Sequence, residues 1–181
     1  MGKRRQARER ALQALYELEF NDASLDVVLT SRDKDAAADG DIRVYAERLL
    51  RGVTARREEL DSLIQGTSRN WRVARMTPVD RNILRLAVFE MLEETKFLPP
   101  AIIINEAIEI AKRWSGDEAA VFINGVLDAV RKKIRPDESP KKVNHHEPRE
   151  KSPAPFASRR PAERGVRRTE KRSGDSPGRK A

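Results

Sequence analysis

The chain has 181 residues, 36% of them charged, and contains no cysteine. The lack of cysteine excludes a disulfide framework, thiolate catalysis and a cysteine-based metal site, and we expect a cytoplasmic protein. No run approaches the roughly 18 apolar residues needed to cross a bilayer, and no apolar stretch follows the basic N-terminus. The sequence therefore predicts neither a membrane span nor a signal peptide.

The positive charge is concentrated in the last quarter of the chain. Residues 136–181 carry 13 Lys or Arg against 7 Asp or Glu, a net +6 of the overall +8. The same stretch holds seven of the ten prolines and few apolar residues, so it cannot offset the entropy of ordering. We predict a folded domain over residues 1–135 and a disordered, basic, proline-rich tail over residues 136–181.

Within residues 1–135 the apolar spacing is helical, and no period-two strand is evident. The first predicted helix covers residues 4–20. A short second helix, over 24–29, begins at a Ser24 cap. The next pattern predicts one continuous helix over residues 41–65.

The segment Thr77-Pro78-Val79-Asp80 has the features of a helix start. A threonine can cap the helix, proline fits its first turn, and an acid three residues after the cap favours the positive end of the dipole. The helix that follows carries apolar side chains around more than half of its surface. We therefore expect it to be central and nearly buried.

Two further helices complete the predicted domain. Pro99 and Pro100 precede a helix over 101–114, whose Trp114 closes an apolar stripe and is assigned to the core. Asp117 is expected to cap a last helix over 118–133. Apart from the short helix over 24–29, five substantial helices with short links predict an all-α fold, a compact helical bundle. A break between about residues 66 and 77 could divide it into two packed sub-bundles.

No pattern of catalytic residues is evident. The only histidines, His145 and His146, are neighbours in the predicted tail, and two adjacent ligands without fixed partners do not make a metal site. No glycine-rich phosphate loop or nucleophile motif is present. We expect a protein that is not an enzyme and that holds no cofactor and no metal.

The basic start of the chain is the strongest local sign of ligand binding. Lys3, Arg4, Arg5 and Arg8 lie close together, and Arg4 and Arg8 are one helical turn apart, so both could face one phosphate track. Arginine suits this role because its planar fork can grip a phosphate or stack on a base. A solvated, frayed helix start would account for the same composition.

Two residues of the last helix are also unusual. Phe122 lies one turn from the predicted helix start and could present an aromatic platform for an unstacked base, although such aromatics more often belong to a core. Gly125 falls in the middle of the helix, where glycine is unfavourable. We interpret it as a point of close helix–helix approach.

Four blocks of the sequence, in order, resemble the NusB family, and together they span about residues 4–130. The blocks are Arg4-Arg5-Gln6-Ala7-Arg8-Glu9 leading into Ala14-Leu15-Tyr16, then Val79-Asp80-Arg81-Asn82-Ile83-Leu84-Arg85-Leu86-Ala87, then Asn105-Glu106-Ala107-Ile108-Glu109-Ile110-Ala111-Lys112, and finally Phe122-Ile123-Asn124-Gly125-Val126-Leu127-Asp128. The resemblance implies an all-helical fold of two packed three-helix sub-bundles. It also implies a non-catalytic role in processive transcription antitermination, chiefly on ribosomal RNA operons.

The resemblance further implies the partners and the contact residues. NusB proteins bind the boxA element of nascent RNA as a heterodimer with NusE, a small-subunit ribosomal protein, and join RNA polymerase through other Nus factors. The residues expected to contact RNA are Lys3, Arg4, Arg5, Arg8, Arg85, Glu118 and Phe122, and those expected to contact NusE are Tyr16, Asp80 and Glu118, which lies where the two surfaces join.

Alternatives remain open at this point. The chain could be a protein-binding helical adaptor without specific RNA recognition. The near-neutral net charge of residues 1–135 favours this interpretation. It could also be related to the RNA-binding appendages of ribosomal RNA cytosine methyltransferases. A homodimer is compatible with the sequence. We further hypothesise that the tail adds non-specific RNA affinity through counterion release.

Overall fold

The computed structural model describes residues 2–21, 23–33, 39–68, 71–93 and 98–136, all within one compact unit over residues 1–141. Every regular element in these ranges is helical, and none of these helices has the length and apolar character needed to span a bilayer. The predicted disordered tail lies outside the described residues except for Pro136 and stays a prediction. The elements are α1 (Lys3–Phe20), α2 (Leu25–Asp33), α3 (Gly40–Ala55), α4 (Arg57–Gln65), the 3-10 turn η1 (Val73–Arg75), α5 (Pro78–Glu93), α6 (Pro100–Trp114) and α7 (Asp117–Ile134).

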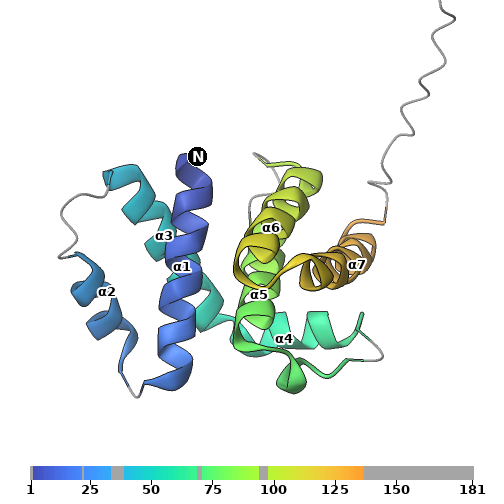
Figure 1. Cartoon of the computed structure of the whole chain (residues 1–181), viewed down its shortest axis with the longest axis horizontal. Helices are drawn as coiled ribbons and strands as arrows, with labels where there is room; N and C mark the ends of the chain where they lie inside the picture. The colour runs from blue at the N-terminus through green and yellow to red at the C-terminus, as the bar shows by residue number, and fades with distance from the viewer. Residues whose placement is uncertain (1, 22, 34–38, 69–70, 94–97, 137–181) are drawn as a thin grey trace, which may run out of the picture. The chain divides into compact units, whose positions relative to one another are not determined.

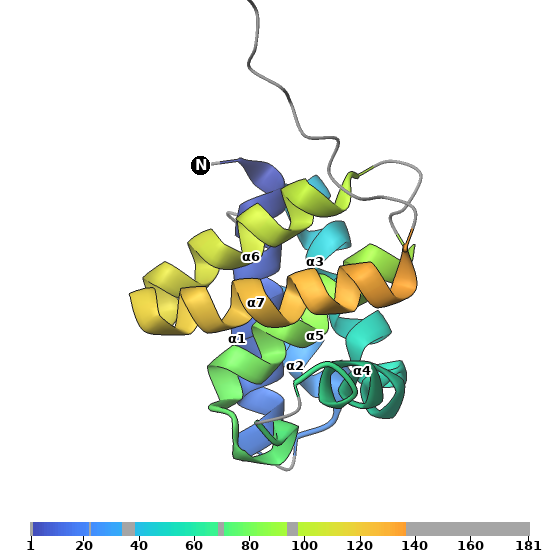
Figure 2. The same ribbon diagram turned by 90° about the vertical axis from the view of Figure 1, so that its right-hand side faces the viewer.

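The helices form two packed sub-bundles (Figures 1 and 2). In the first, α1 packs against α2 and α3, and in the second α5, α6 and α7 pack together while the short α4 lies against α5 and α7. Helix α5 also contacts α1 and α3, so it joins the two sub-bundles. These contacts confirm the predicted all-α fold and its division into two parts.

Helix α5 is the centre of the domain, as its apolar pattern predicts. Every residue from 82 to 91 is buried, and Leu84 and Val88 have no exposed surface. The helix starts where expected, because the Thr77 hydroxyl accepts a hydrogen bond from the Asp80 N–H at 3.1 Å. A helix covered on all sides can fix the relative positions of its neighbours.

The prediction of one helix over 41–65 is wrong, because the chain turns at Arg56. This residue has φ −113° and ψ 21°, and its guanidinium is held by Glu59 at 2.8 Å and by Glu93 at 2.6 Å. The turn lets α3 pack in the first sub-bundle and α4 in the second. The chain therefore passes between the sub-bundles at Arg56, and not in the predicted break after residue 66.

Two other helix starts test the predicted caps. The Ser24 hydroxyl accepts the Val27 N–H at 3.4 Å, which confirms the cap, and the helix continues to Asp33. Asp117 does not cap the last helix but lies within its first turn. Gly116 takes the cap position with φ 99°, a left-handed conformation that glycine adopts without steric strain.

The close helix approach expected at Gly125 occurs instead at Gly52. Gly125 is exposed, and a Cβ built there would meet no atom within 4 Å. A Cβ at Gly52 would overlap the Phe89 ring, with Cε1 only 2.7 Å away. The missing side chain at Gly52 thus lets α3 and α5 pack face to face.

The two glycines give a matched test of this packing. Gly52→Ala should destabilise the fold by about 1–3 kcal/mol because the Phe89 ring must move. Gly125→Ala should instead be neutral or stabilise it by up to about 1 kcal/mol through helix propensity. Urea unfolding of both variants measures the difference, and equal effects would show that Gly52 is not a packing constraint.

Candidate nucleic-acid interface

The first turn of α1 presents two exposed cations. The Lys3 ammonium lies 2.6 Å from Asp39 and 3.1 Å from Asp41, and the Arg4 guanidinium lies 5.7 Å from the centre of the Tyr45 ring. Exposed ion pairs contribute little to the stability of the fold, since water competes for both charges. A phosphate group could therefore replace the acidic partners of Lys3.

Arg5 is partly exposed and anchors the start of α1 to α6. Its guanidinium donates two hydrogen bonds of 2.8 Å to the two carboxylate oxygens of Glu106. These bonds lower the pKa of Glu106, more than its partial burial raises it. Arg5 thus combines a structural contact with a partly exposed positive charge.

Arg8 does not lie on an exposed face with Arg4, where it was expected to contact phosphates. Its side chain is only 4% exposed, and its Nε and Nη2 donate to the Glu90 carboxylate at 2.8 Å. Its Nη1 also approaches Glu106 at 3.4 Å, and the Tyr45 hydroxyl donates to Glu90. Arg4 and Arg8 therefore do not share an exposed face: Arg4 faces solvent, and Arg8 lies between α1 and α5.

A second buried cluster contains Arg85, another expected RNA contact. Its Nε and Nη2 donate to the Asp61 carboxylate at 2.7 and 2.8 Å, and its Nη1 donates to Glu19 at 2.9 Å. Arg81 and Asn82 donate to the same Glu19. Burial raises the pKa of Glu19. The hydrogen bonds from Arg81 and Asn82 and the charge of Arg85 lower this pKa by more, so its net shift is downward and the carboxylate stays ionised.

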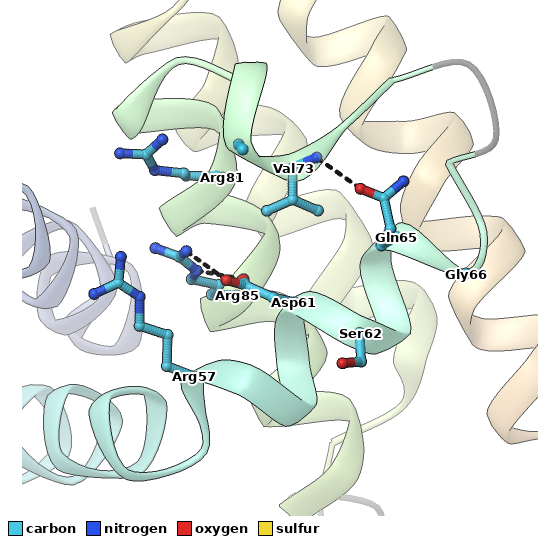
Figure 3. Close-up of a pocket in the computed structure, with 9 residues that line it drawn as sticks. Arg57, Asp61, Ser62, Gln65, Gly66, Val73, Arg81 and Arg85 are labelled. Carbon is cyan, nitrogen blue, oxygen red and sulfur yellow. Dashed lines mark hydrogen bonds and ion pairs between the residues drawn. The ribbon is translucent and has the colours of Figure 1, made fainter.

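Figure 3 shows Arg85 in the wall of an open hollow between α4 and α5. The hollow has a volume of about 770 Å³, and Arg57, Arg81 and Asp61 also line it. Four of the five N–H groups of Arg85 are used by Asp61, Glu19 and Asn82. Arg85 is thus held as a structural cation that joins α5 to α1 and α4.

The first turns of α7 present an acid and an aromatic ring. Glu118 is exposed and lies in the first turn of the helix, where the positive end of the helix dipole favours an acid. Phe122 is partly buried, and its ring centre lies 5.7 Å from that of Trp71. The Glu9–Arg113 ion pair at 3.0 Å holds the end of α6, just before α7, against α1. The chain enters α7, with Phe122 in its second turn, directly after this contact between α6 and α1.

A separate exposed surface lies at the other end of α1. Tyr16 is 44% exposed and its ring centre is 4.7 Å from that of Phe20. Asp80 lies in the first turn of α5, and its buried Oδ1 has no hydrogen-bond donor within the described part of the chain. The Glu19–Arg81 ion pair brings these two segments together, so Tyr16 and Asp80 belong to one region of the molecule.

Sequence reasoning assigned one tryptophan wrongly and overlooked the other. Trp114 is 38% exposed beside Arg113, so its assignment to the core is wrong. Trp71 is 58% exposed and touches Phe122, yet it falls in a segment that the apolar pattern marked only as a break. The available signal was a large aromatic residue next to Arg72, outside any apolar stripe.

Comparison with known proteins places this geometry in a family. The model of the NusB family matches residues 5–132. The Transcription antitermination protein NusB of Desulforapulum autotrophicum is 47% identical over 133 residues, 72% of this chain and 92% of the relative. The protein of the same name from Myxococcus xanthus is 42% identical over 134 residues, covering 72% of this chain and 95% of its own.

Two solved structures share the fold. The structure of T. maritima NusB superposes with a TM-score of 0.66 and 37% identity, covering 72% of this chain and 91% of its own. A structure of the antitermination factors NusB and NusE in complex with dsRNA gives a TM-score of 0.65 and 28% identity. That match covers 74% of this chain and 98% of the matched chain.

The buried Arg8–Glu90 pair predicts a coupled loss of stability. Arg8→Met should lower the free energy of unfolding by about 3–5 kcal/mol, because it leaves a buried carboxylate without its cation. Adding Glu90→Gln removes that charge and keeps an acceptor for Tyr45, so it should restore on the order of 1–3 kcal/mol. Urea unfolding of the two single variants and the double variant measures this coupling; simple additivity would contradict it.

Proposed function

The chain belongs to the NusB family, and on that premise we propose that it is a transcription antitermination factor that binds boxA RNA of nascent ribosomal RNA transcripts together with NusE. The observation that carries the RNA contact is the exposed basic first turn of α1. Phe122 on α7 adds an aromatic ring, and the Glu9–Arg113 pair holds the end of α6, just before α7, against α1. Cations for phosphates and an aromatic ring for an unstacked base are what single-stranded RNA requires.

The residues proposed to contact RNA differ from the sequence expectation in one respect. Lys3, Arg4, Arg5 and Phe122 remain candidates for direct contact because each has exposed surface. The side chains of Arg8 and Arg85 are each 4% exposed and already bonded to carboxylates, so we assign them a positioning role. The proposed RNA surface is therefore smaller than the arginine-rich sequence indicates.

The proposed NusE surface uses Tyr16 and Asp80, with Glu118 where the RNA and protein surfaces join. Tyr16 and its neighbour Phe20 offer exposed apolar area at one end of α1. The unpaired buried Oδ1 of Asp80 favours a partner that supplies a hydrogen-bond donor, since an unsatisfied buried acceptor is destabilising. The solved NusB and NusE complex with dsRNA supports the pairing of the two proteins.

The proposed mechanism is that of an adaptor, in which no covalent bond is made or broken. RNA and NusE bind adjoining surfaces, so each adds contact area for the other and the joint complex is tighter than either pair. The assembly then joins RNA polymerase through other Nus factors, which places its action in the cytoplasm. A homodimer formed through the same face would compete with both partners.

Fluorescence anisotropy with labelled RNA tests this proposal. The purified chain is titrated with boxA RNA and with a scrambled control at about 0.15 M salt, with and without NusE. We expect tighter binding to boxA, strengthened further by NusE. Binding of NusE without RNA preference would instead support the protein-only adaptor, and no binding of either partner would refute the proposal.

The role of the α1 cations predicts a change in salt dependence. Arg4→Gln should weaken binding of boxA and scrambled RNA by similar factors and reduce the slope of log K against log salt by about 1. Arg57→Gln, which removes an exposed arginine on α4, is the control and should leave the slope unchanged. Equal slopes for the wild type and Arg4→Gln would exclude a phosphate contact at Arg4.

The charge of residues 136–181 predicts a second, separate contribution. Deleting this segment, which carries a net +6, should lower the salt slope for both RNAs and leave the preference for boxA over the scrambled RNA unchanged. An unchanged slope would show that the segment adds no RNA affinity. A lost boxA preference would show that specificity, and not only non-specific attraction, depends on it.

A further inference from the structure

The Trp71 ring is one of the largest exposed apolar groups in the described part of the chain. We propose that Trp71 is a second stacking platform, next to Phe122, for an unpaired RNA base. This inference rests on the proposed RNA binding and adds a contact residue to it.

The two rings are close but do not cover each other. Their centres are 5.7 Å apart and their planes are inclined by 59°, so they are not stacked face to face. Phe122 is partly buried, whereas Trp71 keeps 58% of its surface exposed. Two adjacent, inclined aromatic surfaces can accept the bases of neighbouring nucleotides, each of which has a flat face for stacking.

The backbone at Trp71 is held by hydrogen bonds with the buried Ser68, and the following turn by Gln65. The Trp71 carbonyl accepts a hydrogen bond of 2.8 Å from the Ser68 hydroxyl, and the Trp71 N–H donates to the Ser68 carbonyl at 3.2 Å. Gln65 holds the next turn, since its Oε1 accepts the Val73 N–H at 3.0 Å (Figure 3). An exposed ring on a fixed backbone loses little entropy on binding, which is the property of a preorganised platform.

The charge near Trp71 suits the phosphates on either side of a stacked base. Arg72 and Arg75 belong to the same short segment, are exposed, and have no ion-pair partner among the described residues. The segment 71–76 contains no acid. Trp71 therefore extends the proposed RNA path beyond Phe122, with a local positive charge of its own.

Two substitutions distinguish stacking from a purely structural role for Trp71, in which it only shields Phe122 from water. Trp71→Leu keeps an apolar side chain against Phe122 but removes the aromatic face, whereas Trp71→Phe keeps that face. Stacking predicts that boxA RNA binding weakens about tenfold in the leucine variant and by less than about threefold in the phenylalanine variant. Val44→Ala, at an exposed valine on α3, is the surface control and should not change binding.

A fluorescence measurement tests the platform without changing Trp71. The chain has two tryptophans, so Trp114→Phe leaves Trp71 as the only one. Unlabelled boxA RNA should quench its emission, and one RNA in a series with single abasic positions should bind yet quench much less. RNA binding with no quenching and no effect of Trp71→Leu would overturn the platform and leave the proposed function standing. Failure of the wild type to bind any RNA would refute both.

Discussion

Two buried ion-pair clusters of opposite polarity join α1 to α5, and the contact surfaces depend on them. At one end Arg8 of α1 meets Glu90 of α5, and at the other Glu19 of α1 meets Arg85 and Arg81 of α5. The residue numbers rise along one helix as they fall along the other, so the helices are antiparallel. A shifted or parallel register would leave buried charges unpaired, at a cost of several kcal/mol. The clusters therefore specify how the two sub-bundles fit together.

This arrangement separates arginines that hold the fold from cations that remain exposed. The partners of Arg8 and Arg85 are anchored in helices that the core already fixes, so these guanidiniums are not available at the surface. Lys3 and Arg4, one turn earlier than Arg8, extend past the buried contact and face solvent. The Arg8 cluster also reaches Glu106 of α6, and the Glu19 cluster lies at the start of α5 near Asp80, so the proposed RNA and NusE surfaces both border α1.

The features that could be predicted from sequence are those with a local cause. The start of α5 follows from the Thr77 cap, and its burial follows from apolar residues around most of its surface. The turn at Arg56 has no glycine or proline to signal it, because it results from the packing of α3 and α4 in different sub-bundles. The carboxylate partner of Arg8 is 82 positions away in the sequence, so the charge of Arg8 alone predicted a phosphate contact. In the fold Arg8 lies on the same buried face of α1 as Ala11 and Leu12. Trp71 was not predicted because it lies outside any helix, where the spacing of apolar residues gives no information about a side chain's position.

We propose that exposed cations contact RNA while the buried arginines only position them. The most direct test is the salt dependence of boxA RNA binding by the double variant Arg8→Met, Glu90→Gln, at a temperature where unfolding shows the variant to be folded. We expect this variant to bind with the affinity of the wild type within about twofold and with the same slope, because no phosphate contact is lost. A slope lower by about 1 would show that Arg8 reaches the RNA, and that the buried pair opens when RNA binds.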